Sequence, residues 1–341
     1  MPFWNSAWSL LALANLFWAG NIVLGRGVVG MVPPIALAYW RWTGAFLIAV
    51  GFAWPYLRRD AATLLRHWRM MLLLSATGIA TYNTMSYIGL TSTTALNVLL
   101  LQSAGPLVII VWAFALFGER PTLWQSAGPL IIIVWAFLLF REWPSAMQVL
   151  AVLLSLCGVA VIAAHGSLHT LLHLSLNRGD VWILAAMVIY GIYAAMFRVR
   201  PAAHPLSFLV AMMGVGSMMI LPFYVWEIAQ GGRIEGGLPA WLALVYIAVF
   251  PSFVAYLFFN RGIELIGATR ASQSWHLMPV FGSILAVLFL GETFYLYHAI
   301  GIAMIAAGIV LASVKRSGAV QPRVACRMAR HSLKSRASGD A

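Results

Sequence analysis

Long runs of apolar residues, separated by short polar breaks, occupy most of this chain. An α-helix rises about 1.5 Å per residue, so about 20 apolar residues cross a hydrocarbon layer about 30 Å thick. Charged and turn residues fill the breaks, as at Arg58-Arg59-Asp60. The pattern predicts membrane-spanning helices at eleven runs: 6–29, 34–57, 70–90, 93–117, 124–140, 145–164, 181–199, 206–226, 239–259, 269–290 and 295–314.

The composition supports a membrane location for these runs. Hydrophobic residues make up 62% of the 341 residues and charged residues 9%, whereas soluble domains carry about 25% charged residues. One soluble core could not bury so much apolar surface, so much of it is expected to face lipid. The first run, from Trp8 to Val29, has no basic segment before it and no cleavage site, and is interpreted as an uncleaved span. We therefore expect an all-α integral membrane protein.

The net charge of +12 is distributed in a way that orients the chain in a membrane. Seven of the 21 Lys and Arg residues lie in the last 27 positions, and four lie between residues 58 and 69. Basic loops face the cytoplasm. Ten spans with the N-terminus inside place both clusters there, whereas eleven do not. We expect ten spans in a bacterial inner membrane, with both termini cytoplasmic. A nucleic-acid partner is not expected, because no basic stripe is interleaved with exposed aromatic residues.

Two parts of the chain repeat the same spacing of marker residues. A proline, a glutamate, a polar residue and a glycine follow one another at intervals of 13, 6 and 10 residues: Pro129, Glu142, Gln148 and Gly158, then Pro279, Glu292, His298 and Gly308. Duplicated transporters contain such repeats, and an odd number of spans in each unit inverts one unit relative to the other. We expect a five-helix repeat over 1–165, a second over 166–314 and a basic cytoplasmic tail over 315–341.

A second repeat is short and nearly exact. The segment Gln102–Phe117 recurs as Gln125–Phe140, with 14 of 16 positions identical, after a shift of 23 residues. Such identity indicates a recent tandem copy, an engineered insertion or an artefact of expression, rather than an ancient duplication. Because an added span would reverse the orientation of everything after it, we expect one copy not to complete a normal crossing.

Several stretches resemble the drug/metabolite transporter superfamily, EamA type. They are NLFWAGNIVLGR in the first run, YWRW with Arg41 in the second, and YNTMSYIGLTSTTALNVLLLQSAGPL across the third and fourth. The resemblance covers residues 5–315 and is greatest to bacterial aromatic amino acid exporters. It implies ten helices in two inverted five-helix repeats, a central cavity and alternating access. The tandem copy is surplus to the family pattern, which continues from residue 117 to about 141.

Polar and aromatic residues deep in the apolar runs are the candidate site. An unpaired polar side chain is costly in lipid, so such residues face either a cavity or another helix. Packing between helices is the alternative role for each of them, and interfacial anchoring for Trp and Tyr near span ends. Aromatic walls with a few amides suit a flat, zwitterionic or cationic substrate. The predicted substrate-binding residues are Trp18, Asn21, Tyr82, Asn83, Asn97, Gln102, Ser103, Tyr190, Tyr193, Tyr256, Gln273, Trp275 and His276.

Several ionisable residues have two interpretations. His276, eight residues into its run, is either a substrate ligand or pH-sensitive group, or a neutral packing histidine. Arg41 either attracts a substrate carboxylate or bonds to carbonyls at a helix end, and the sequence favours the structural role. Glutamates that recur at helix starts are interpreted as caps of free N–H groups, which the helix dipole favours. They are Glu119, Glu142 and Glu292.

The chain lacks two kinds of energy-coupling group. No Asp or Glu lies in the middle of an apolar run, and no P-loop is present, so the sequence predicts neither a carboxylate proton relay nor ATP hydrolysis. We interpret the chain as a cofactor-free exporter of aromatic or neutral amino acids, monomeric or a weak homo-oligomer, with a small-molecule substrate and the lipid bilayer as its partners. The alternatives are a drug or nucleobase exporter, a membrane enzyme using His165, His169 and His173, and a structural subunit.

Overall fold

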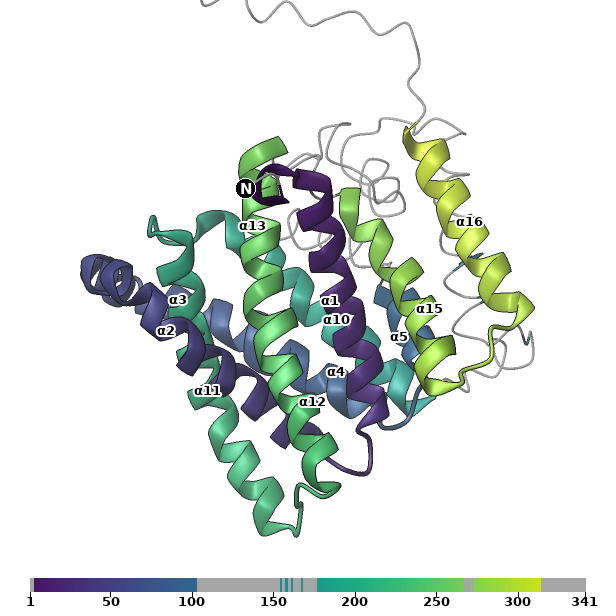
Figure 1. Ribbon diagram of the computed structural model, residues 1–341, viewed down its shortest axis with the longest axis horizontal. Coiled ribbons are helices and arrows are strands. Elements are labelled where there is room, and N and C mark those ends of the chain that lie inside the picture. Colours follow the sequence, from purple (N-terminus) through teal and green to yellow (C-terminus); the bar gives the residue numbers. More distant parts are fainter. Residues whose placement is uncertain are drawn as a thin grey trace, which may run out of the picture.

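The computed structural model describes residues 3–102, 177–266 and 273–313, with Ala271 and isolated positions between 154 and 167 (Figure 1). These residues form helices and no strands. The N-terminal part contains η1 (Phe3–Asn5), α1 (Ala7–Gly27), α2 (Pro34–Arg66), α3 (Trp68–Ser75), η2 (Ala76–Thr81), α4 (Tyr82–Leu90) and α5 (Ala95–Gln102). The C-terminal part contains α10 (Arg178–Met196), η4 (Phe197–Val199), α11 (Pro205–Ala229), α12 (Gly237–Val249), η5 (Phe250–Val254), α13 (Ala255–Ile266), η6 (Gln273–His276), α15 (Leu277–Leu290) and α16 (Leu296–Ser313).

Five helices in the described parts of the chain are long and apolar enough to cross a membrane. They are α1, α2, α10, α11 and the continuous helix made of α12, η5 and α13. The expected all-helical membrane fold is therefore confirmed, and the number of ten spans stays a prediction. The second copy of the tandem repeat, the boundary at 165/166, Glu119, Glu142 and the tail over 315–341 lie outside the described residues.

Large apolar side chains point away from the packed interior on several of these helices. Met218 of α11 is 75% exposed, and Leu288 and Phe289 of α15 are 71% and 74% exposed. Exposure of these side chains to water would cost about 25 cal/mol of free energy per Å² of apolar area. A lipid environment removes that cost, which is consistent with the membrane location that composition predicts.

The α2 helix continues further than its apolar run indicates. The run ends at residue 57, whereas the helix reaches Arg66 and has 33 residues. The charged break 58–60 is followed by Ala61 and Ala62, and arginine and alanine are good helix formers, so the backbone stays helical beyond the apolar run. In Figure 1 this end of α2 extends outward at the left of the molecule, while α16 lies at the opposite edge.

The helices α2 and α11 run antiparallel and cap each other. The carboxylate of Glu227, near the end of α11, accepts hydrogen bonds from the N–H groups of Ile35 (3.0 Å) and Ala36 (2.6 Å) at the start of α2. Asp60, near the end of α2, accepts from the N–H of His204 (2.7 Å) and from the hydroxyl of Ser207 at the start of α11. Each helix therefore supplies an acid that satisfies free donors at the other's N-terminus.

Glu292 makes a similar cap across the two halves. Its carboxylate accepts from the N–H groups of Ala95 (2.8 Å) and Leu96 (2.9 Å) at the start of α5. The sequence predicts that Glu292 caps a helix N-terminus, and it does so. The helix is α5, from the other half of the chain, rather than α16, which follows Glu292 directly.

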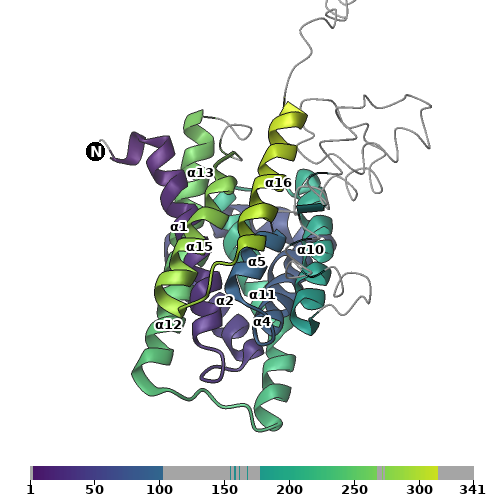
Figure 2. The same ribbon diagram turned by 90° about the vertical axis from the view of Figure 1, so that its right-hand side faces the viewer.

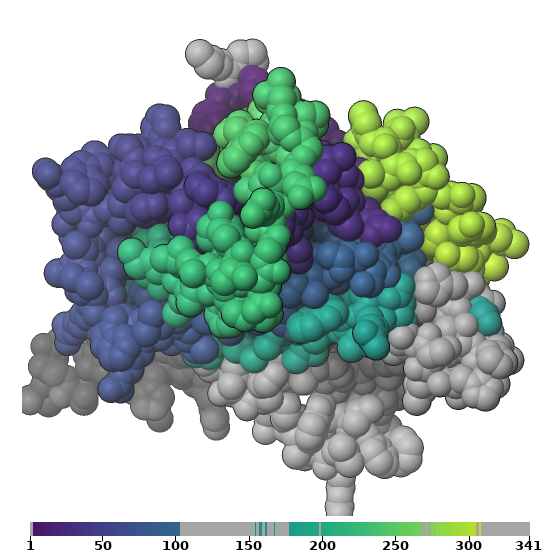
Figure 3. Space-filling model, turned by 90° about the horizontal axis from the view of Figure 1, so that it is seen from below, coloured from purple at the N-terminus to yellow at the C-terminus, as the bar shows by residue number. Residues whose placement is uncertain are grey.

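The described elements of the two halves follow the same order. In each, two long helices are followed by a helix interrupted near its middle by a π-helical turn: α3, η2 and α4 in the first half, and α12, η5 and α13 in the second. The halves interpenetrate, because α1 lies beside α13 and α15 (Figure 2). From below, the second-half helices (green) lie across the centre of the molecule, against first-half helices in purple and blue (Figure 3).

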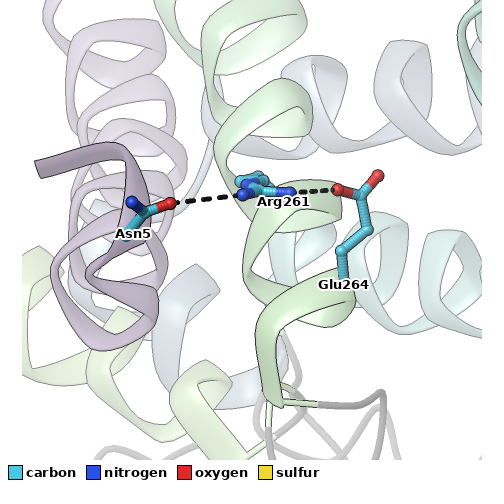
Figure 4. Close-up of polar contacts among 3 residues, drawn as sticks. All are labelled: Asn5, Arg261 and Glu264. Carbon is cyan, nitrogen blue, oxygen red and sulfur yellow. Dashed lines mark hydrogen bonds and ion pairs between the residues drawn. The ribbon is translucent and has the colours of Figure 1, made fainter. Parts of the chain in front are cut away.

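The N-terminal turn is also held by the second half. Arg261 of α13 donates to the Asn5 side chain of η1 (3.3 Å) and pairs with Glu264 one turn further along α13 (2.9 Å), as Figure 4 shows. Phe3 and Trp4 pack their rings against Phe258 of the same helix. The start of the chain is thereby fixed at one end of α13.

Candidate functional site

A tyrosine cluster lies between α4 and α10. The rings of Tyr82 and Tyr190 have centroids 4.7 Å apart, and those of Tyr190 and Tyr193 are 5.5 Å apart. Tyr190 and Tyr193 are three residues apart, so they share one face of α10. Gly78 in η2 lets α10 approach, because a Cβ at this position would overlap the ring of Tyr193. The three tyrosines are half-buried and present aromatic faces from both halves of the chain.

A second aromatic cluster is built around Trp18 of α1. Its ring lies 5.5 Å from Tyr256, 5.2 Å from Phe259 and 5.9 Å from Trp275, measured between centroids. The indole N–H of Trp18 donates to the carbonyl of Pro251 in η5 at 2.9 Å, which fixes the orientation of the ring. Trp275 is 39% exposed, so this cluster reaches from the interior to an accessible surface.

Arg41 lies in the interior, between the two interrupted helices. Only 4% of the Arg41 surface is exposed. Its Nε donates to the hydroxyl of Ser252 in η5 (2.7 Å), and its Nη1 donates to Asn83 Oδ1 (2.8 Å) and Tyr87 Oη (3.0 Å) in α4. The guanidinium also lies over the Trp42 ring, 4.6 Å from its centroid. One cation therefore connects the π-helical region of the first half with that of the second.

Each partner of Arg41 is held in place by a hydrogen bond that it donates to another group. The Asn83 amide nitrogen donates to the carbonyls of Gly78 and Ile79, both at 3.1 Å, which leaves its oxygen to accept. The Ser252 hydroxyl donates to the Ile247 carbonyl at 2.8 Å. The Tyr87 hydroxyl donates to Asn21 Oδ1 at 2.6 Å. A π-turn disturbs the regular backbone ladder, and here the side chains of Asn83 and Ser252 satisfy carbonyls at the two turns.

Both aromatic clusters lie next to residues that bind Arg41. Trp18, whose ring packs on Tyr256, donates to Pro251, the residue before Ser252. Tyr82 of the tyrosine cluster comes directly before Asn83. Aromatic rings of α1, α4, α10 and α13 therefore lie near the Arg41 network.

Eight of the predicted substrate-binding residues come together in this arrangement. Two supply polar groups to the Arg41 network and six supply rings: Asn21 and Asn83, then Trp18, Tyr82, Tyr190, Tyr193, Tyr256 and Trp275. Their role in binding a substrate stays a prediction. The sequence did not select Tyr87, Ser252 or Phe259. The proline before Ser252 was the available signal, because a proline inside a helix disturbs the hydrogen-bond ladder.

The remaining predicted residues lie elsewhere or outside the description. Asn97 is buried in α5, where its amide donates to Thr93 (3.4 Å), and Thr93 in turn donates to Asp180 (2.5 Å) at the start of α10. Gln102 is half-buried at the end of α5. Ser103 lies outside the described residues, as do the side chains of Gln273 and His276, so both interpretations of His276 stay open.

The described residues contain no group of three or more His, Cys, Asp or Glu side chains placed to hold a metal ion. The histidines of the enzyme alternative, His165, His169 and His173, lie outside the described residues. The acids that are described lie at helix ends or in loops, as the sequence predicts. Asp60, Glu227 and Glu292 cap helices.

The sequence profile of the EamA-like transporter family matches residues 5–133 and 177–314, one segment in each half of the chain. The chain belongs to the EamA-like transporter family. A membrane transporter is therefore the supported class of function. The EamA relatives are themselves named as transporters, which points to transport rather than to an enzymatic role.

Three curated relatives of this EamA chain cover most of its length. The uncharacterized transporter YyaM of Bacillus subtilis is 24% identical over 88% of this chain and 90% of its own length. The uncharacterized inner membrane transporter YicL of Salmonella typhimurium is 27% identical over 75% of this chain and 74% of its own. A probable terminal-alkyne amino-acid exporter of Streptantibioticus cattleyicolor is 24% identical over 92% of this chain and 94% of its own length.

A solved crystal structure shares the fold of this EamA chain. The two superpose with a TM-score of 0.55 at 19% identity, over 90% of this chain and 97% of the other. The likeness supports the helical arrangement described above.

Proposed function

We propose that this protein exports aromatic and other apolar amino acids across the bacterial inner membrane. The observation that carries the proposal is the pair of aromatic clusters beside Arg41, which contain rings from both halves of the chain. Flat aromatic faces bind aromatic side chains by stacked or edge-to-face contact and attract an ammonium group by cation–π interaction. The similarity to a relative named as a probable amino-acid exporter supports the same substrate class.

Alternating access would move the two halves relative to each other around this region. The shared order of elements and the reciprocal caps of α2 and α11 are what two inverted five-helix repeats would produce. In this proposal, the first repeat covers 1–165 and the second covers 166–314. In this proposal, both termini and the basic segment 58–69 face the cytoplasm, which agrees with the distribution of basic residues.

Transport by the purified full-length protein in liposomes tests the proposal. Vesicles are loaded with an unlabelled compound, and uptake of the labelled compound is followed for phenylalanine, tryptophan, leucine, a nucleobase and a cationic drug. We expect saturable phenylalanine and tryptophan flux well above that of empty vesicles. Flux of the drug or nucleobase alone would favour the alternative exporter, and no flux of any compound by correctly folded protein would contradict a transporter of these classes.

The membrane orientation has its own test. Single cysteines are introduced at Arg59 and at Arg233 in a protein whose Cys157 and Cys326 are replaced by serine. The proposal places these two exposed positions on opposite sides of the membrane. An impermeant maleimide added outside intact cells should label the variant at 233 and not the one at 59. Labelling of both, or the reverse pattern, would contradict the orientation.

A further inference from the structure

Arg41 is a buried cation whose charge no described side chain neutralises. Its three hydrogen-bond partners, Ser252, Asn83 and Tyr87, are all neutral. The described acids lie at helix ends or in loops, and the ion pair on α13 joins Arg261 to Glu264. Neutral acceptors satisfy hydrogen bonds and leave the net charge in a low-dielectric region, which is expensive without an anion.

The guanidinium also has donors left for a ligand. Nε and Nη1 are used, whereas Nη2 donates to no described residue. The described partners of Arg41 therefore leave Nη2 available to a ligand acceptor. A guanidinium is well suited to a carboxylate, because its planar N–H groups match the two oxygens.

The surroundings of Arg41 match the rest of an aromatic amino acid. Tyr82 comes directly before Asn83, which accepts from Arg41. The aromatic cluster around Trp18 is joined by a hydrogen bond to Pro251, the residue before Ser252. A carboxylate at Arg41 would place the attached side chain and ammonium group among aromatic faces.

We propose that Arg41 is the binding group for the carboxylate of the transported substrate. The substrate class is therefore restricted to compounds that carry a free carboxylate and an apolar or aromatic side chain. This inference rests on the proposed amino-acid export. It also replaces the purely structural role that the sequence favours for Arg41. A buried cation with only a structural role would be expected to have an acidic partner, and no described side chain provides one.

Matched substrates test the inference on the wild-type protein. Phenylalanine and its amide have the same side chain and ammonium group, and they differ in the carboxylate. In liposomes, phenylalaninamide should compete with labelled phenylalanine about tenfold to hundredfold more weakly than phenylalanine does, the range expected for hydrogen bonds to a charged group. Tryptophan fluorescence measures the same selectivity as binding, independently of flux. Equal competition and equal binding by the amide would overturn the inference and leave amino-acid export intact.

Variants locate the selectivity at Arg41. Arg41→Gln should lower phenylalanine uptake at least about tenfold and reduce the preference for phenylalanine over its amide. Arg41→Lys should retain part of that preference, because the charge remains. The matched control is Arg26→Gln, since Arg26 donates only to the backbone carbonyls of Leu90 and Thr91. Unchanged selectivity in a folded Arg41→Gln protein would contradict the assignment.

Two further outcomes separate the possible anions. Replacing chloride by methanesulfonate on both sides of the membrane should leave phenylalanine uptake unchanged. A requirement for chloride, together with transport of the amide, would show that an inorganic ion occupies Arg41 and would overturn the substrate role. Absence of both flux and binding for every amino acid would refute the proposed function together with the inference.

Discussion

The two interrupted helices reach the same site by different local means. In the first half, the π-turn η2 contains Gly78, and the carbonyls of Gly78 and Ile79 are satisfied by the amide of Asn83. In the second half, η5 contains Pro251, whose carbonyl accepts from Trp18, while Ser252 satisfies Ile247. Proline removes a backbone donor, whereas glycine allows α10 to approach.

This comparison shows what an interrupted helix provides in a membrane. In a regular helix, the backbone carbonyls accept hydrogen bonds from N–H groups of the same helix, so few polar groups remain for neighbouring helices. Each π-turn here brings one polar side chain, Asn83 or Ser252, to the same guanidinium. Each is also followed closely by a tyrosine of an aromatic cluster, Tyr82 after η2 and Tyr256 after η5. The two halves therefore contribute equivalent parts to one site.

The largest expected effect comes from placing an acid at the first-half partner. Asn83→Asp puts a carboxylate next to Arg41 Nη1, where Asn83 Oδ1 now lies at 2.8 Å. The new acid should neutralise the guanidinium and compete with the substrate carboxylate, so phenylalanine uptake should fall by about a hundredfold.

The thermal melting temperature of Asn83→Asp should change little, because the counter-ion gained by the buried guanidinium offsets the amide donor lost to the Gly78 and Ile79 carbonyls. Asn177→Asp is the control, since aspartate also serves as an N-cap and Asn177 caps α10. Normal uptake by folded Asn83→Asp would show that the substrate does not need Arg41.

The second-largest expected effect distinguishes Tyr256 from Tyr82. Tyr256→Ala should lower phenylalanine uptake by about tenfold, because its ring packs against Trp18 at the centre of the second aromatic cluster. Tyr82→Ala should have a smaller effect, because its ring packs only in the α4–α10 cluster. Tyr39→Ala, at the stacked pair with Tyr224, is the control. Uptake is compared at equal amounts of protein in the membrane, and normal uptake by both site variants would contradict the aromatic clusters as the binding site.

Removal of the second-half hydroxyl should have a moderate effect. Ser252→Ala removes the acceptor of Arg41 Nε and the donor to Ile247, and it should destabilise the protein by about 1–3 kcal/mol. Uptake should fall only a few-fold, because Asn83 and Tyr87 still hold the guanidinium. Thermal unfolding and uptake are measured together. A loss as large as that of Asn83→Asp would mean that the second half dominates the site.

The smallest effect is expected at the reciprocal caps. Glu227→Gln and Asp60→Asn each remove a charge from a helix N-terminus and should lower stability by about 0.5–1 kcal/mol. The two losses should be similar, because α2 and α11 occupy equivalent positions. Melting temperatures measure both, and transport by each folded variant should stay near wild type. A large loss at only one end would argue against the equivalence of the halves.

Apolar runs predicted the helices that the structure describes, and the polar and aromatic residues within the runs included most of the rings of the two clusters. Trp18, Tyr82 and Trp275 were favoured because they lie several residues inside their predicted spans, away from the membrane interface. The π-turns were not predicted, because their residues, such as Gly78 and Ser252, look like ordinary packing residues. The significance of Arg41 depends on its having no acidic partner among the described residues, which is visible only when distant helices are assembled.

The central claim is that both halves build one substrate site, and a double-mutant cycle tests it most directly. Phenylalanine uptake is measured for Tyr82→Ala, Tyr256→Ala and the double variant, at equal protein levels in liposomes. Residues in one site are coupled, so the double variant should lose clearly less than the product of the two single losses. Single losses that multiply within error would place Tyr82 and Tyr256 in independent sites and contradict the account.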